Sequence, residues 1–368
     1  MDFAPSNEEV ALRDAARSLL SRRCSTNAAR GALDHGPALI PDDCWRELCA
    51  LGWVGIAVPE SAGGGGAGLV TAAVLAEEAG RALLPGPLLS ALAASVAAAW
   101  GGAEPALLAD LAAGTRRATL AVDEPGVGFG PGAVTTVAVT ASGGVALTGN
   151  KALVPDVAES DLILVAARAT NGAHGATLFV VPRDAPGVEI VPLRRLDGQS
   201  LADVRLQEAF AEPLGSGVED LGAAYDAWTA LLAADLLGTA CAALDATVEY
   251  ARQRVQFGHP IGTFQAVSHR LADACVQVEI ARGLVYGAAL ALDEHRPDAG
   301  RFVSAAKAWA GDAAIFATEA ALQIHGGIGY TWESDVHLLL RRARANAVTL
   351  GDADQHRDRL AGLLESGW

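Results

Sequence analysis

The sequence RQRVQFGHPIGTFQ, residues 252–265, lies between two long runs that are rich in alanine and leucine. These runs extend over residues 231–250 and 269–292, and we predict that both are helices. Between them, Gly258 and Pro260 interrupt helical structure, because glycine lowers helix stability and proline removes a backbone donor. The segment therefore places its polar and aromatic side chains at a helix end and in the turn that follows.

The side chains of this segment suit a phosphate-bearing ligand. Arginine pairs with phosphate through its planar fork, and an aromatic ring can cover a purine face. A plainer interpretation is also open, in which cations at a helix C-terminus complement the helix dipole. The spacing alone does not choose between the two. The residues concerned are Arg252, Arg254, Gln256, Phe257 and Gln265.

Two motifs in the chain resemble the hallmarks of the acyl-CoA dehydrogenase family. The first is RVQFGHPIGTFQ, residues 254–265, and the second is QIHGGIGY, residues 323–330. They occur in the order of the family and at about its separation, and the resemblance covers nearly the whole chain. It implies a helical domain, a β domain and a C-terminal helical bundle.

The coarse pattern of the chain agrees with that architecture and predicts an α+β multidomain protein. We expect an N-terminal all-α domain over residues 1–115, a middle antiparallel β-barrel or sandwich over 116–214, and a C-terminal four-helix bundle over 215–368. The chain has 368 residues, of which 51% are hydrophobic, and this is enough apolar material for two or three packed units.

The middle domain is predicted from short runs of β-branched residues that are separated by turn residues. Turns are predicted at residues 142–144, 149–150, 171–172 and 184–187. Strands are predicted at residues 118–122, 134–140, 145–148, 162–167, 176–181 and 188–191.

The net charge of the chain limits the classes of partner that it can bind. The net charge is −16 and the sequence pI is near 4.9. We expect no nucleic-acid partner, because an acidic surface repels phosphate backbones. A local basic pocket for a phosphorylated cofactor stays compatible with this charge.

Cysteine usage and targeting signals predict a cytoplasmic protein. The five cysteines include no CxxC pair, so we expect reduced, mostly buried thiols and no metal site. The N-terminus lacks an apolar signal core. Residues 83–103 carry no charge over a length that could span a membrane. Proline and glycine interrupt them, however, so we expect a buried loop and helix and no membrane span. The cysteines are Cys24, Cys44, Cys49, Cys241 and Cys275.

The resemblance implies a redox function. Members of the family oxidise an acyl-CoA to the 2-enoyl-CoA: a glutamate removes the α-proton, FAD accepts hydride from the β-carbon, and electron-transferring flavoprotein is the usual electron acceptor. A clamp for the ADP half of FAD, which in the family is bound mainly to a neighbouring subunit, is kept in this sequence. A plain helix stop is the other interpretation of its two glycines. The expected clamp residues are Arg254, Gln256, Phe257, Gln265, Gln323, Gly326 and Gly327.

The half of the FAD site that contacts the isoalloxazine departs from the family pattern. GNKALVP, residues 149–155, replaces Gly-x-Lys-x-Trp-Ile-Thr, so Leu153 and Pro155 stand where Trp and Thr contact the flavin. Leucine cannot stack as tryptophan does, and proline offers neither a hydroxyl nor an N–H. Earlier in the chain, DEPG at residues 123–126 resembles the Thr-Glu-Pro strand end of the family, but GFG at residues 128–130 replaces its Gly-Ser-Asp.

The catalytic base of the family is also missing from its usual place. Leu350 occupies the position of the glutamate that precedes Gly-Thr in the family. At the alternative base position, Trp228 is present, with Thr229 where an arginine usually stands. Asp352, two residues further on, is a candidate for a relocated base. Asp235 lies in an apolar helix and is expected to have a partner across a helix interface, because burying a lone carboxylate is costly.

Three hypotheses follow. The first is a non-catalytic subunit that shares FAD with a second acyl-CoA dehydrogenase-like subunit and donates the ADP-binding half of the site. This arrangement resembles the actinobacterial α2β2 enzymes, whose relatives often handle bulky steroid-derived acyl-CoA. The second is a self-sufficient acyl-CoA dehydrogenase in which Asp352 is a relocated base. The third is a CoA-ester binding scaffold without flavin.

Overall fold

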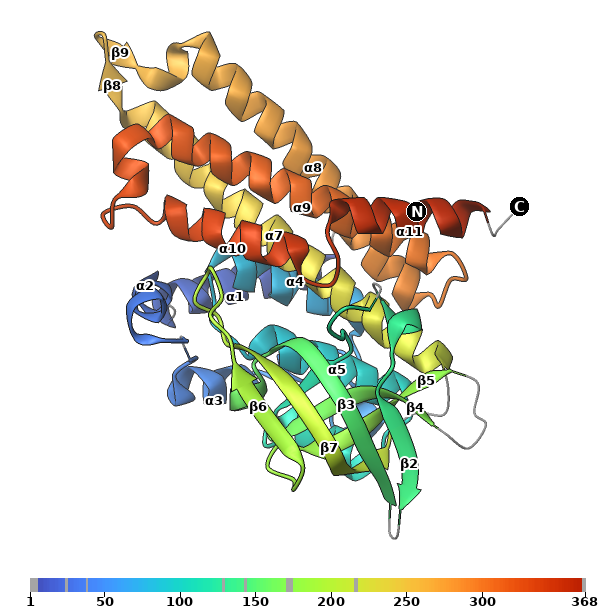
Figure 1. The fold of residues 1–368 in the computed structure, drawn as a ribbon. Helices are drawn as coiled ribbons and strands as arrows, with labels where there is room; N and C mark the ends of the chain where they lie inside the picture. Colours follow the sequence, from blue (N-terminus) through green and yellow to red (C-terminus); the bar gives the residue numbers. More distant parts are fainter. Residues whose placement is uncertain are drawn as a thin grey trace. The chain divides into compact units, whose positions relative to one another are not determined.

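The computed structural model describes residues 6–23, 26–37, 39–127, 130–141, 144–169, 175–214 and 218–365 (Figure 1). The chain forms two compact units, which we call the helical unit and the sheet unit. The helical unit contains the described residues of Met1–Arg30, Ala73–Leu84 and Ala230–Trp368. The sheet unit contains those of Gly31–Ala72 and Pro85–Thr229.

The helical unit is built from long helices rich in alanine and leucine, two residues that favour helix. Helix α1 (Asn7–Arg23) begins at a capping box, in which Ser6 and Glu9 each accept the backbone N–H of the other. The predicted helical runs are confirmed by α7 and α8 and extend further than predicted. The later helices are α7 (Val218–Gln253), α8 (Gln265–Asp293), α9 (Ala299–His325), α10 (Val336–Val348) and α11 (Ala353–Glu365).

Two of these helices, α7 and α8, are long and apolar enough to cross a bilayer when judged by length and composition over the described residues. The most apolar window of α7 is 89% buried inside the protein, as expected of a core helix, whereas that of α8 is 39% buried. Residues 83–103 contain α5 (Leu88–Trp100), most of whose residues are buried, which confirms the predicted buried helix.

Buried charges join helices within the helical unit. Glu77 on α4 (Gly68–Arg81) accepts hydrogen bonds from Arg282 at 2.7 Å and from the Tyr286 hydroxyl at 2.5 Å. Glu78 pairs with Arg17 of α1 through two bonds of 2.7 and 3.0 Å. Both carboxylates are almost fully buried. Because a buried carboxylate is stable only with partners, these bonds fix α4 to α1 and α8.

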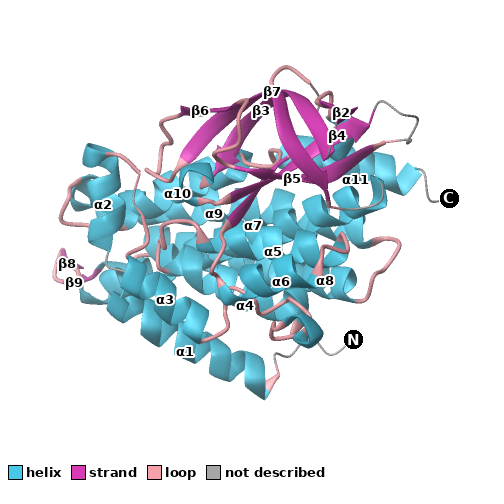
Figure 2. Ribbon diagram, turned by 90° about the horizontal axis from the view of Figure 1, so that it is seen from below, coloured by secondary structure: helices cyan, strands magenta, loops and turns pink. Residues whose placement is uncertain are grey.

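The sheet unit contains a mainly antiparallel sheet together with α3 (Asp42–Ala50), α5 and α6 (Pro105–Ala113) (Figure 2). Among the described residues the sheet has seven strands in the order β1-β4-β2-β3-β7-β5, with β6 on β7. Strand β4 also pairs with β5, which closes the sheet into a barrel around an apolar core. The strands are β1 (Ala118–Ala121), β2 (Val137–Ala141), β3 (Gly144–Pro155), β4 (Leu162–Ala169), β5 (Ala176–Pro182), β6 (Val188–Pro192) and β7 (Leu201–Pro213).

The strand prediction was correct for β1 to β6 in position and was wrong at two points. The turn predicted at residues 149–150 lies inside β3, where the pairing with β7 shifts register between Leu147 and Gly149. Strand β7 was not predicted, although Ala202, Val204 and Leu206 are buried at alternating positions. Part of the turn predicted at 142–144 and the whole of the turn predicted at 171–172 lie outside the described residues.

The predicted fold class is confirmed, since helices, a β-barrel and a helical bundle follow one another along the chain. The boundaries at residues 115 and 214 stay a prediction.

Candidate functional site

The segment 252–265 forms a two-stranded hairpin at the end of α7. Strand β8 (Val255–Gln256) pairs with β9 (His259–Pro260). Phe257 and Gly258 form the turn with φ values of 50° and 80°. Two successive residues with positive φ are typical of a tight two-residue hairpin turn. The positive φ is favourable for Gly258 but unfavourable for Phe257. The turn holds Phe257 at the tip of the hairpin, where 89% of the residue is exposed.

Arg254 lies at the base of this hairpin and is held by its backbone. Its N–H donates to the Tyr250 carbonyl, and its own carbonyl accepts from the N–H of Ile261, both at 2.8 Å. Its side chain is exposed and has no ion-pair or hydrogen-bond partner within the described residues. Gln256 on β8 and Gln265 at the start of α8 are also exposed. The hairpin therefore presents a guanidinium, a ring and two amides to solvent.

The second motif forms the end of α9 and the 3₁₀ turn that follows it. Gly326 ends the helix with φ 62°, and its N–H bonds to the carbonyls of Leu322 and Gln323. A Cβ placed on Gly326 or on Gly327 would meet nothing within 4 Å, so both glycines face open space. Gln323 is exposed on the last turn of the helix. A ligand can therefore approach the backbone closely at this turn.

One aromatic contact brings the two motifs together. Tyr250, on the last turns of α7, stacks on His325, the last residue of α9, with ring centroids 4.2 Å apart. The hairpin and the glycine turn both begin within a few residues of this contact. The chain thus joins a cation, an exposed ring and an open backbone turn, groups that suit a diphosphate bound to a purine nucleoside.

Leu350, which the sequence analysis places at the expected base position, is buried and apolar. Leu350 is 3% exposed and has a φ of 56°. Its carbonyl bonds to Nε2 of His356 at 2.9 Å. Nζ of the buried Lys307 donates to the carbonyls of Ala347 at 2.9 Å and Gly351 at 2.8 Å. The loop keeps a fixed shape, but the side chain at this position cannot accept a proton.

The two buried side chains that hold this loop have shifted pKa values. Burial lowers the pKa of Lys307 to about 7 and the pKa of His356 to about 3. The sequence analysis did not select either residue. In the sequence, the burial of Lys307 is indicated only by its position within the alanine-rich run of α9.

The other candidate carboxylates have structural partners. Asp352 caps α11: its Oδ1 accepts the N–H of Gln355 at 2.9 Å, and the Gln355 side chain accepts the N–H of Asp352 at 3.0 Å. Asp235, which is fully buried, accepts two bonds from Arg342 at 3.0 and 2.6 Å and one from Asn346 at 2.5 Å. The predicted helix-interface partner of Asp235 is therefore confirmed.

In the sheet unit, Glu124 and Lys151, which keep the family pattern around the expected isoalloxazine site, form a buried pair inside the barrel. Glu124 accepts hydrogen bonds from Nζ of Lys151 at 2.6 Å and from both backbone and hydroxyl groups of Thr135 and Thr136. Burial alone would raise the pKa of Glu124, but these bonds outweigh it and lower the pKa to about 2. Burial lowers the pKa of Lys151 to about 8 against the opposing effect of Glu124. Both groups serve as a buried ion pair.

Leu153 and Pro155, which stand at the positions expected to contact the isoalloxazine, both lie on β3. Leu153 is 52% exposed with a φ of 55°, and Pro155 ends β3, where its carbonyl accepts the Thr119 hydroxyl at 2.7 Å. The substituted positions Gly128 and Phe129 lie outside the described residues. The alternative base position on α7 is filled by the buried Trp228, and the hydroxyl of Thr229 bonds to the Tyr225 carbonyl.

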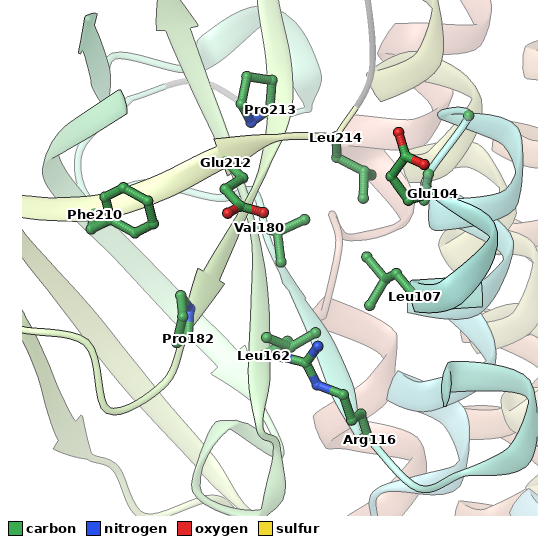
Figure 3. A pocket seen from close by; sticks show the side chains of 12 residues that line it. Glu104, Leu107, Arg116, Leu162, Val180, Pro182, Phe210, Glu212, Pro213 and Leu214 are labelled. Carbon is green, nitrogen blue, oxygen red and sulfur yellow. The ribbon is translucent and has the colours of Figure 1, made fainter. Parts of the chain in front are cut away.

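Each unit also contains a pocket that the sequence analysis did not predict. The pocket of the sheet unit is about 410 Å³ and is lined by residues of α6 and the strands (Figure 3). Arg116 extends towards Leu162, and Glu212 lies beside Val180. The pocket of the helical unit, about 330 Å³, is lined by the ion pairs around Glu77. Neither pocket contains a predicted clamp residue.

Among the described residues, no group of three or more His, Cys, Asp or Glu side chains is placed to hold a metal ion. Cys24 lies outside the described residues. Cys44 and Cys241 are buried thiols, Cys49 is half-buried and Cys275 is exposed, and none of the four forms a disulfide. Burial raises the pKa of Cys241 to about 11, so its thiol is unreactive near neutral pH.

Known proteins are similar to this chain over its whole length. Three models match in succession: the acyl-CoA dehydrogenase N-terminal domain over residues 6–107, the middle domain over 119–209 and the C-terminal domain over 217–364. Acyl-CoA dehydrogenase IpdE2 of Mycobacterium tuberculosis is 34% identical over 373 residues, which cover 100% of this chain and 99% of IpdE2.

Two solved structures have the same fold. The steroid ACAD Tcur3481–Tcur3483 matches with a TM-score of 0.90 and 34% identity, covering 98% of each chain. The ChsE4–ChsE5 complex from Mycobacterium tuberculosis matches with a TM-score of 0.91 and 27% identity, covering 100% of each chain. The motifs, the fold and these comparisons agree that the chain belongs to the acyl-CoA dehydrogenase family, whose members are FAD-binding oxidoreductases that act on acyl-CoA.

Proposed function

We propose that this chain is a subunit of a heteromeric acyl-CoA dehydrogenase and donates the ADP-binding half of an FAD site to a partner subunit. The observation that carries the proposal is the asymmetry between the two halves of the site. Arg254, Phe257 and the Gly326-Gly327 turn are present and open to solvent. The positions that would contact the isoalloxazine, or remove a proton, carry Leu153, Pro155 and Leu350 instead.

The clamp residues fit their proposed ligand chemically. The Arg254 guanidinium can form charge-assisted bonds to the pyrophosphate, and the Phe257 ring can cover the adenine. Gln256, Gln265 and Gln323 add amide donors and acceptors, and Gly326 and Gly327 allow the backbone to approach the phosphates. When bound, FAD supplies the hydride acceptor of the reaction. In this chain the clamp residues would only bind and orient its ADP part.

The base is assigned to the partner, because Leu350 stands at the expected position and two of the nearby carboxylates, Asp352 and Asp235, are engaged in structural contacts. Asp352 is bonded to the first turn of α11, and Asp235 is neutralised by Arg342 inside the helical unit. Leu350 can accept no proton. A self-sufficient enzyme would need one of these carboxylates to leave its structural partner, which costs free energy.

The relatives support a heteromeric assembly. The matched structures Tcur3481–Tcur3483 and ChsE4–ChsE5 are each described as a pair of chains, and the first is described as a steroid ACAD. We therefore propose a second acyl-CoA dehydrogenase-like subunit as partner and a bulky, steroid-derived acyl-CoA as substrate. Electron-transferring flavoprotein is the proposed electron acceptor, and the cytoplasm is the proposed location.

The test compares two arginines of the same segment in the assembled complex. Arg254→Ala removes a charge-assisted contact worth about 1.5–3 kcal/mol, so flavin affinity should fall roughly 10- to 150-fold. Arg252→Ala removes an exposed arginine from the last turn of α7 and should retain nearly all flavin. Normal flavin content in the Arg254→Ala complex would refute the donated clamp. A complex that binds acyl-CoA without any flavin would indicate a scaffold instead.

A further inference from the structure

The pocket of the helical unit gathers arginine side chains in an otherwise acidic chain. Residues of α1, α4, α7 and α8 enclose its volume of about 330 Å³, which lies at the lower end of the range for small-molecule sites. Among the described residues, four arginines line it, although the chain has a net charge of −16. We call it the arginine pocket. The arginines are Arg13, Arg17, Arg81 and Arg282.

Two buried carboxylates neutralise only part of the charge of these arginines. Glu77 accepts a hydrogen bond from Arg282 at 2.7 Å, and its other oxygen lies 3.9 Å from Nη2 of Arg13. Glu78 accepts two bonds from Arg17. Set against the four guanidiniums, the two carboxylates leave an excess of two positive charges inside the pocket.

The carboxylates that balance this excess lie at the exposed rim of the pocket. Asp245 pairs with Arg81, and Glu279 lies 3.5 Å from Arg282, but the two acidic side chains are 63% and 62% exposed. Exposed ion pairs contribute little free energy, so a ligand anion can displace them at small cost. Cys241 adds no negative charge near neutral pH, because burial raises the pKa of its thiol to about 11.

Arg13 has hydrogen-bond donors that the fold does not use. A guanidinium carries five N–H donors. Within the described residues, the one hydrogen bond of this guanidinium runs from Nη2 to the Tyr286 hydroxyl at 3.1 Å. Its Nε is buried, and no described residue accepts from it. A buried donor without an acceptor costs free energy and needs an explanation. An oxyanion in the pocket would offer acceptors to this guanidinium.

A purely structural role explains only some of these features. The bonds of Glu77 and Glu78 fix α4 to α1 and α8, but this role requires neither a pocket nor an excess of guanidiniums. A phosphate group matches what remains. It carries up to two negative charges in one compact group, and its oxygens accept charge-assisted bonds from arginine. A carboxylate carries only one charge.

We propose that the arginine pocket binds a phosphate group, either as free phosphate or as part of a small phosphorylated molecule, with Arg13 as its main ligand residue. Arg81 and Arg282 donate to the same group when Asp245 and Glu279 turn towards solvent. The bound group bridges α1 to α4 and α8. The site is separate from the proposed FAD clamp, because no predicted clamp residue lines the pocket.

Isothermal titration calorimetry of the purified full chain tests the proposal. The two probes are inorganic phosphate and glycerol 3-phosphate, at an ionic strength held constant with chloride. Arg13→Gln removes the main ligand residue. Arg22→Gln is the matched control, because Arg22 is exposed on the same helix and bonds to the Ser18 carbonyl of that helix. Glu279→Gln removes a rim carboxylate and keeps the size of the side chain.

We expect wild type to bind one phosphate group per chain. Arg13→Gln should weaken binding about 10- to 150-fold, which is the effect of one charge-assisted hydrogen bond, and Arg22→Gln should leave it unchanged. Glu279→Gln should strengthen binding about 5-fold, because it removes a negative charge next to the ligand. Binding elsewhere on the chain would not respond in opposite directions to these two substitutions.

The two probes distinguish the sources of the phosphate group. Tighter binding of glycerol 3-phosphate identifies a phosphorylated molecule, and binding of inorganic phosphate at least as tight identifies free phosphate. The absence of binding with both probes would overturn the proposal, as would equal phosphate affinities of wild type and Arg13→Gln.

Thermal unfolding separates lost binding from lost folding. A folded Arg13→Gln chain should gain less in unfolding temperature than wild type at the same phosphate concentration. If Arg13→Gln does not fold, Glu279→Gln decides the question, because unchanged or weaker phosphate binding in that variant contradicts the proposed site.

Discussion

Tyr250 and His325 lie 75 residues apart in sequence, and their rings stack at 4.2 Å with an angle of 18° between the planes. The contact joins the end of α7 to the end of α9. Burial lowers the pKa of His325, so its ring is neutral at pH 7 and stacks without the cost of a buried charge. The two family motifs are thereby held at one end of the helical unit.

Replacing His325 with alanine should loosen the clamp. An aromatic pair contributes about 0.5–1.5 kcal/mol, so we expect flavin affinity of the assembled complex to fall roughly 2- to 12-fold. Tyr250→Phe keeps the ring and serves as the control, with near wild-type affinity. Flavin titration followed by fluorescence measures both. Equal affinities of the wild type and His325→Ala would show that the stack does not position the clamp.

The buried ion pair between Asp235 and Arg342 of α10 should contribute far more to stability than the exposed pair that Arg344, on the same helix, forms with Glu319. Arg342→Met leaves Asp235 buried without its cation and should cost about 3–5 kcal/mol of unfolding free energy. Arg344→Met removes an exposed pair with Glu319 and should cost less than about 1 kcal/mol. Urea unfolding of both variants gives the comparison. Similar losses in the two variants would contradict the assigned role of Asp235.

The buried carboxylate of Glu124 predicts that the stability of the fold falls with pH below about 4.5. The pKa of Glu124 is about 2 in the folded chain and 4.5 ordinarily. A lowered carboxyl pKa stabilises the fold above pH 4.5, and this contribution is lost as the pH falls from 4.5 towards 2. Wild type should therefore lose more stability between pH 5 and 3 than Glu124→Gln does. Parallel loss in both proteins would contradict this account.

Asp352 should be dispensable for catalysis by the complex. Asparagine caps a helix about as well as aspartate, so Asp352→Asn should keep both stability and acyl-CoA-dependent dye reduction. Asp352→Ala removes the cap and should cost about 1 kcal/mol of stability while activity per folded complex is retained. Loss of dye reduction in a flavin-loaded Asp352→Asn complex would identify this carboxylate as the base.

Much of the fold could be predicted from local patterns. The helical runs follow from their apolar pattern and β1 to β6 from short β-branched runs between turn residues. The clamp motifs are contiguous in sequence. Strand β7 was missed because exposed residues interrupt its alternation and Glu208 has a φ of 52°. Register shifts also hid the continuity of β3 through Gly149. Such features depend on pairing with a distant strand, which local sequence does not record.

For buried charged groups, the sequence predicts that a partner must exist but does not identify it. Asp235 required a partner, but the sequence does not identify Arg342, which lies 107 residues away. The roles of Lys307 and His356 were missed because both bond to backbone carbonyls, which any residue can provide. The assignment of Leu350 to the expected base position, by contrast, rests on its neighbours in the family pattern and stays a prediction.

The most direct test of the donated half-site is the flavin content of the purified chain, alone and in complex with its partner, with subunit masses measured alongside. The account predicts a colourless lone chain and a yellow complex with one flavin per pair of subunits. A lone chain that purifies yellow with one flavin per chain would contradict it, because the positions of Leu153, Pro155 and Leu350 would then belong to a complete site.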